Sequence, residues 1–156
     1  MINPDLAIYL AITGYGDDPA PVNAALDLAP SVVWVRDEPF STEFPDARRL
    51  RSQWMLASGL PADALFRDHC AALLALLEPR ADRLRMAARQ WHVSLVVGRF
   101  YHHGDPALYL EPETVQRFAA LGLDASFDQL AHAPGHGTPL YRDPPAGNDA
   151  PEEQDT

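Results

Sequence analysis

Residues 65–101 read LFRDHCAALLALLEPRADRLRMAARQWHVSLVVGRFY, and this stretch decides the fold. In its first part the apolar residues recur at helical spacing, which is typical of a helix with one buried face. The residues that share this apolar stripe are Leu65, Phe66, Cys70, Leu73, Leu74, Leu77, Leu84 and Ala88. Pro79 interrupts the pattern, and a proline inside a helix costs about 3 kcal/mol. We therefore predict one helix that ends near Glu78 and a second that begins at Pro79.

From Val93 onward the apolar period changes to two, which indicates a strand. Apolar residues fall on both faces of this segment, so we expect it to be a central strand of a sheet. A glycine and a proline within residues 102–106 predict a turn, after which residues 107–110 would return as a second strand. The stretch is therefore predicted to hold two helices followed by a hairpin.

Outward from this stretch, short apolar or alternating runs predict further strands at residues 6–13, 31–36, 53–58 and 123–130. Helices are expected between Pro19 and Pro30 and between Pro112 and Gly122, because proline suits a first helical turn and glycine follows a last one. Residues 37–50 are polar, hold two prolines and show no sustained period, which predicts a long loop.

These elements predict an α+β fold with a largely antiparallel sheet of about six strands and helices on one face. The first six elements would have the ferredoxin-like order β-α-β-β-α-β, and a further β-α-β would extend the sheet. We expect one domain over residues 1–131. Residues 132–156 are rich in proline and acidic residues, which predicts a disordered tail.

The composition favours a cytoplasmic protein. No apolar run approaches the length of a transmembrane helix, and the start MINPDLAIYL lacks the features of a signal peptide. Cys70 has no second cysteine to pair with, and its place on the apolar stripe predicts a buried thiol. We expect no membrane association.

The net charge of −10 limits the class of partner. Nucleic acid needs a basic surface to neutralise its phosphates, so we expect no nucleic-acid partner. A basic protein partner is compatible with the acidic surplus, because opposite charge speeds the encounter of two proteins.

The sequence predicts no catalytic residue, no metal site and no cofactor. The candidate metal ligands are His102, His103, Asp105, His132 and His136. Their spacing matches no standard zinc pattern, and two of them fall in the expected tail. Paired acids such as Asp17 and Asp18 stand at predicted helix starts, where capping explains them better than catalysis does.

Aromatic residues on or beside the predicted strands are the candidate binding residues. Most are expected in the core, but those on an uncovered sheet face would form a platform with a neighbouring arginine. The residues predicted to bind on this basis are Tyr9, Trp34, Trp54, Arg99 and Tyr101.

Several short motifs carry a family resemblance. They are Ile12-Thr13-Gly14, residues 22–26, Trp34, Trp54-Met55-Leu56-Ala57-Ser58, Leu77-Glu78-Pro79-Arg80, Leu108-Tyr109-Leu110-Glu111-Pro112 and Leu121-Gly122. Through them the chain resembles the bacterial family DUF4279, a domain of unknown function, over roughly residues 6–130. It departs from the family at Asp37-Glu38, where members often carry a glycine. The resemblance implies an α+β fold and transfers no catalytic residue, because none is established for the family.

The function that we expect is non-enzymatic protein binding, in the form of an immunity-type inhibitor of a basic bacterial toxin. An analogy with small bacterial immunity domains motivates this form. The alternative is a small-molecule-binding or enzymatic domain that uses the exposed sheet face or the turn at residues 102–105. A structural module with homo-oligomeric contacts is the third possibility, and the sequence does not set the oligomeric state.

Overall fold

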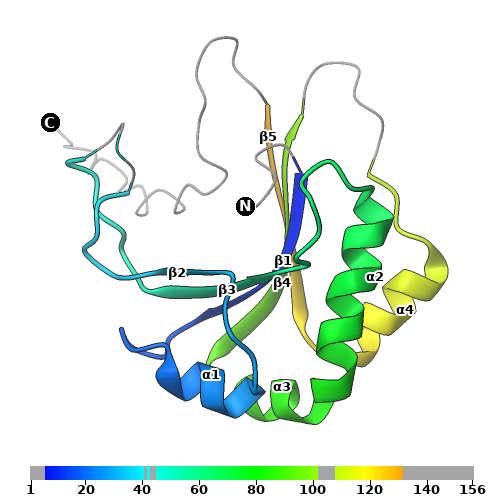
Figure 1. The fold of residues 1–156 in the computed structure, drawn as a ribbon, viewed down its shortest axis with the longest axis horizontal. Helices are drawn as coiled ribbons and strands as arrows, with labels where there is room; N and C mark the ends of the chain where they lie inside the picture. Colours follow the sequence, from blue (N-terminus) through cyan, green and yellow to red (C-terminus); the bar gives the residue numbers. More distant parts are fainter. Residues whose placement is uncertain (1–5, 41, 43–44, 102–107, 132–156) are drawn as a thin grey trace, which may run out of the picture.

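The computed structural model describes residues 6–40, 42, 45–101 and 108–131. Among them, five strands form one mixed sheet (Figure 1). The strands are β1 (Leu6–Thr13), β2 (Val32–Trp34), β3 (Gln53–Ala57), β4 (His92–Tyr101) and β5 (Asp124–Ala131), in the spatial order β2-β3-β1-β4-β5. The β2–β3, β3–β1 and β1–β4 pairs are antiparallel, and the β4–β5 pair is parallel. The α+β class is therefore confirmed.

The helices lie together on one side of the sheet (Figure 1). They are α1 (Ala20–Leu26), α2 (Phe66–Leu77), α3 (Ala81–Ala87) and α4 (Pro112–Ala120), with a 3-10 turn, η1 (Glu78–Arg80), between α2 and α3. The break predicted at Pro79 is confirmed, because Pro79 lies in η1, where its missing N–H interrupts no α-helical ladder. Cys70, Leu73, Leu74 and Leu77 of α2 are buried, as the apolar stripe predicted.

The alternation of side chains along β1 determines the two faces of the sheet. Ile8, Leu10 and Ile12 point toward the helices and join the main core. Ala7, Tyr9 and Ala11 point the other way and form a smaller buried cluster with Met55 and Val96. Both faces of β1 are buried along most of its length, one in the main core and one in the smaller cluster, which agrees with its high apolar content.

The prediction of six strands is wrong, because the structure has five strands among the described residues. The predicted turn at residues 102–106 and residue 107 lie outside the described part of the chain. Residues 108–110 form no strand, and β4 pairs instead with β5. A parallel neighbour requires a crossover connection, and α4 provides it. Leu108 and Leu110 pack against the main core, which accounts for their apolar character.

The described part of the segment between β2 and β3, residues 35–40, 42 and 45–52, contains backbone pairing that the predicted long loop did not include. Pro39 and Arg48 form an antiparallel bridge, and the N–H of Phe40 donates to the carbonyl of Ala47 at 2.7 Å. This arm projects away from the helices (Figure 1). Within the described part of the chain, no helix has the length and apolar content to cross a membrane. The expected tail at residues 132–156 lies outside the described residues.

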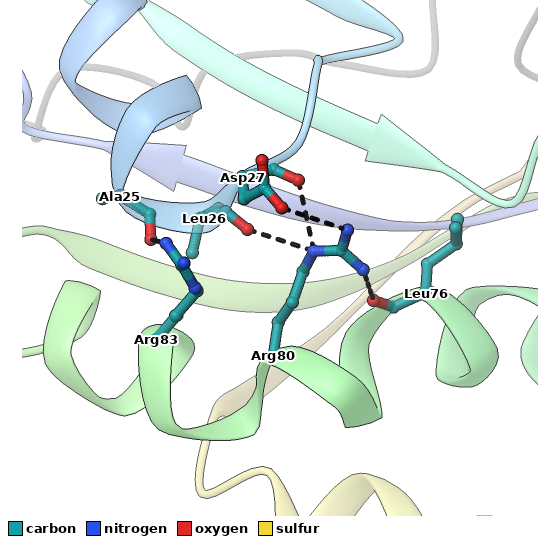
Figure 2. A network of polar contacts seen from close by, with 6 residues as sticks. All are labelled: Ala25, Leu26, Asp27, Leu76, Arg80 and Arg83. Carbon is teal, nitrogen blue, oxygen red and sulfur yellow. Dashed lines mark hydrogen bonds and ion pairs between the residues drawn. The ribbon is translucent and has the colours of Figure 1, made fainter.

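Two arginines hold the C-terminal end of α1 (Figure 2). The last carbonyls of a helix have no partner within it, so side chains often bond to them. Arg80 Nε donates to the carbonyls of Leu26 at 3.1 Å and of Asp27 at 3.2 Å. Arg83 donates to the carbonyl of Ala25 at 3.1 Å. The turn after α2 is thereby joined to α1, which is distant in the sequence.

Candidate functional site

An open groove on the helix side of the sheet has a volume of about 360 Å³. We call it the α2–α4 groove, because it lies between the start of α2 and the segment that leads into α4. Its lining residues are Leu6, Leu65, Phe66, Arg67, Cys70, Arg99, Leu108, Tyr109, Leu110, Glu111 and Thr114. The lining is mostly apolar, and volumes of about 300–1,000 Å³ are usual for pockets that bind ligands.

Two large apolar side chains on this groove are exposed. Leu65 is 56% exposed and Tyr109 is 72% exposed, and both belong to the groove lining. Leu65 is the N-cap residue of α2 and does not belong to the buried face of the helix. Exposed apolar side chains grouped beside an apolar groove are a common feature of interaction surfaces, so this groove is the candidate site.

Charged side chains complete the polar part of the lining. Arg67 comes from the first turn of α2, Arg99 from β4 and Glu111 from the N-cap position of α4. Cys70 also lines the groove and is buried. Burial raises the pKa of its thiol to about 12. A thiol with this pKa is protonated at neutral pH and is a poor nucleophile. The groove therefore suits contact with an apolar group better than covalent chemistry.

The structure does not bring the predicted binding residues together. Arg99 lines the α2–α4 groove. Trp54 is 0% exposed in the main core, and its Nε1 donates to Asn23 Oδ1 at 2.8 Å, so it presents no surface to a partner. Tyr9 is buried and Trp34 is half-buried on the opposite face of the sheet. Tyr101 belongs to β4, and its side chain lies outside the described part.

Trp34 belongs to a stack at the base of the β2–β3 arm. The guanidinium of Arg49 lies 3.7 Å from the ring centre of Trp34 and 5.0 Å from that of Phe40. Arg49 also donates to the carbonyl of Phe40 at 2.8 Å. This cation–π contact fixes the arm against the sheet. The predicted pairing of an aromatic residue with an arginine therefore exists at Trp34, with Arg49 as the arginine.

A second, smaller pocket of about 110 Å³ lies where β1, β2, β3 and α2 meet. Ser58 and His69 both line it, and Ser58 Oγ lies 2.5 Å from His69 Nδ1. His69 Nε2 is buried and has no hydrogen-bond partner among the residues that the structure describes. A buried polar atom without a partner costs about 1–3 kcal/mol, so this atom is a candidate contact for a small ligand.

The paired acids that the sequence assigned to capping have structural partners. Asp18 Oδ1 accepts from the N–H of Ala20 at 2.9 Å, in the first turn of α1. Asp17 accepts from Ser52 Oγ at 2.7 Å and pairs with Arg36 at 2.9 Å. The hydrogen bond from Ser52, followed by the charge and hydrogen bond of Arg36, lowers the pKa of Asp17 below its ordinary value. The N-cap of α1 is Pro19, so Asp18 does not cap the helix as predicted but forms a local turn just before it, whereas Asp17 attaches the loop.

The described residues hold no group of three or more histidine, cysteine or acidic side chains that could bind a metal ion. The metal candidates His102, His103, Asp105, His132 and His136 all lie outside the described part. The groove residues Leu65 and Tyr109 were not among the predicted binding residues. The sequence placed Leu65 on the buried stripe, and that prediction is wrong, because α2 begins at Phe66 and Leu65 is exposed.

The fold and the groove define an α+β domain whose helices cover one face of a mixed five-stranded sheet. The family model DUF4279, described as a domain of unknown function, matches residues 4–132. The chain therefore belongs to the DUF4279 family. Comparison with curated proteins gave no match. Comparison with solved structures gave no match either.

Proposed function

We propose that this chain is a non-enzymatic protein-binding domain that receives an apolar side chain of its partner in the α2–α4 groove. The observation that carries the proposal is the exposure of Leu65 and Tyr109 beside a groove with mostly apolar walls. Interface energy concentrates in a few apolar or aromatic anchors that fill such pockets, surrounded by polar groups. Arg67, Arg99 and Glu111 provide those polar groups here.

The class of partner that we propose is a basic protein, and an immunity-type inhibitor of a basic bacterial toxin is the form that we favour. The net charge of −10 supports this choice, because it favours encounter with a cationic protein and repels nucleic acid. A non-enzymatic role agrees with the raised pKa of Cys70 and with the structural partners of Asp17 and Asp18.

The test is growth rescue against toxins encoded beside the gene, followed by binding measurements on the toxin that is neutralised. Tyr109→Ala and Leu65→Glu are each expected to weaken binding by about thirtyfold, because loss of an anchor that is buried in the complex costs about 2 kcal/mol. Met86 on α3 is equally exposed but lies outside the groove, so Met86→Glu is the matched control.

The control variant should bind like the wild type and should match the groove variants in circular dichroism. If Tyr109→Ala and Leu65→Glu bind as tightly as Met86→Glu, the groove is not the binding surface. Failure of the wild type to neutralise any neighbouring toxin would count against the immunity-type form of the proposal.

The second candidate is a small-molecule-binding domain, and the Ser58–His69 pocket favours it. Ser58 Oγ accepts from the N–H of Leu60 at 3.3 Å and can direct its own hydrogen to His69 Nδ1, which places the ring proton on Nε2. That buried N–H would donate to a small anion. Catalysis is less well supported, because His69 Nε2 contacts no carboxylate among the described residues.

Acetate is the probe for this second candidate. In a nitrogen-15 NMR titration, the Nε2 signal of His69 is expected to shift and saturate, whereas the exposed His92 serves as the internal control. Ser58→Ala should abolish the saturable shift, because it removes the hydrogen bond that fixes the ring. A linear shift of both histidines, or no shift at His69, would contradict ligand binding in this pocket.

A further inference from the structure

The strand β5 is the exposed edge of the sheet. It is the last strand in the spatial order, and β4 is its only hydrogen-bonded neighbour among the described strands. Each residue from Asp124 to Gln129 is exposed, although these residues alternate between the two faces of the sheet. Phe127, at the centre, is 51% exposed. Within the described part of the chain, residues 124–129 therefore keep an aromatic side chain exposed and have no strand paired to their outer edge.

Edge strands of this length are usually protected, because their unpaired N–H and C=O groups attract other strands. Proline, charged side chains and bulges are the common forms of protection. The sequence of β5, DASFDQLA, contains no proline, and its only charged residues are Asp124 and Asp128. Its register with β4 runs without interruption from Asp124 to Ala131, so it contains no bulge. The outer edge of β5 can thus add a strand in a register that keeps these two aspartates away from like charge.

We propose that β5 pairs with β5 of a second copy of this chain, in an antiparallel arrangement about a two-fold axis at Phe127. When two copies of one strand pair antiparallel and continue one sheet, directly opposed side chains point to the same face. The two-fold axis must therefore lie at one residue, which is directly opposite its own copy. The choice of position then decides which residues face each other. The charges of Asp124 and Asp128 select among the positions.

An axis at Ser126 would place Asp124 opposite Asp128 twice, and an axis at Asp128 would place Asp128 opposite itself. Directly opposed like charges destabilise a sheet. An axis at Phe127 instead places Asp128 opposite Ser126 and Ala125 opposite Gln129. It pairs the two Phe127 rings, and it overlaps more of the strand than axes at Ala125 or Gln129. The separation of like charges and the length of paired strand therefore both favour the register with its axis at Phe127.

The test is the mass in solution, measured by sedimentation equilibrium. The wild type is expected to form a dimer of twice 17.2 kDa. Phe127→Asp and Phe127→Lys should each weaken the dimer by roughly tenfold or more, through like charge at the axis and loss of the ring pair. An equimolar mixture of the two variants should associate again, because opposite charges then meet at the axis. Val115→Asp, on the exposed surface of α4, is the matched control and should remain dimeric.

Cysteine cross-linking gives a second measurement that does not depend on a charged variant. Phe127→Cys should form a disulfide-linked dimer under mild oxidation, because the Cα atoms of opposed residues in an antiparallel pair lie about 4.5–5.5 Å apart, within the range that a disulfide spans. Ala125→Cys should not, because its partner in this register is Gln129. A monomeric wild type at the highest concentration measured, or equal cross-linking of both variants, would overturn the proposal.

Discussion

Replacing Trp54 with alanine is expected to lower the free energy of unfolding by about 3–5 kcal/mol, the usual range for loss of a large buried aromatic side chain. Trp54 is fully buried in the main core, where β3 meets the helices. Its loss would leave a cavity that neighbouring side chains fill only in part, because protein interiors are close-packed. Urea denaturation monitored by circular dichroism measures this change.

A smaller substitution separates the packing of Trp54 from its hydrogen bond. Trp54→Phe keeps most of the apolar volume but leaves Asn23 Oδ1 without the donor that it has at 2.8 Å. The expected loss is about 1–3 kcal/mol. In a double-mutant cycle with Asn23→Ala, the two losses should not add, because each variant removes the same bond. Additive losses would show that the Trp54–Asn23 contact does not contribute to stability.

Replacing Arg80 with methionine is expected to lower the free energy of unfolding by about 2–3 kcal/mol, because charged donors make strong hydrogen bonds with backbone carbonyls. The side chain of Arg80 is 26% exposed. Besides its bonds to the carbonyls of Leu26 and Asp27, it donates to the carbonyl of Leu76 at 3.1 Å. Its removal would leave the end of α1 without these donors (Figure 2).

Two further variants test this explanation. Arg80→Lys keeps the charge but lacks the planar fork, so it should recover only part of the stability. Arg83→Met is the matched control, because Arg83 makes one exposed bond, to Ala25. It should cost less than about 1 kcal/mol. Equal losses for Arg80→Met and Arg83→Met would show that the bonds of Arg80 have no special importance.

Local chemistry made several features of the fold predictable. The break at Pro79 follows from a missing N–H, and the burial of Cys70 follows from helical spacing. The family resemblance was also visible in the sequence, and the match over residues 4–132 confirms it. The strand expected at residues 107–110 was wrong, because a short apolar run packs equally well as extended chain at the entrance to a helix.

The candidate site was less predictable than the fold. Trp34 and Trp54 both stand on short apolar strands, yet one lies half-buried beside Arg49 and the other in the core beneath the helices. An apolar period of two indicates that neighbouring residues point to opposite faces of the sheet, but it does not indicate which face the helices cover. The exposure of Leu65 depended on the exact start of α2, and helix boundaries are uncertain by a residue or two.

The sequence by itself determined the α+β class, the helix break at Pro79, the buried thiol and the acidic charge, because each depends on residue type and short-range spacing. Only the tertiary structure decided that β5 joins β4 in parallel and that Leu65 and Tyr109 line the same groove. These features depend on contacts between segments far apart in the chain. Such contacts are set by how whole elements pack, and no local pattern specifies them.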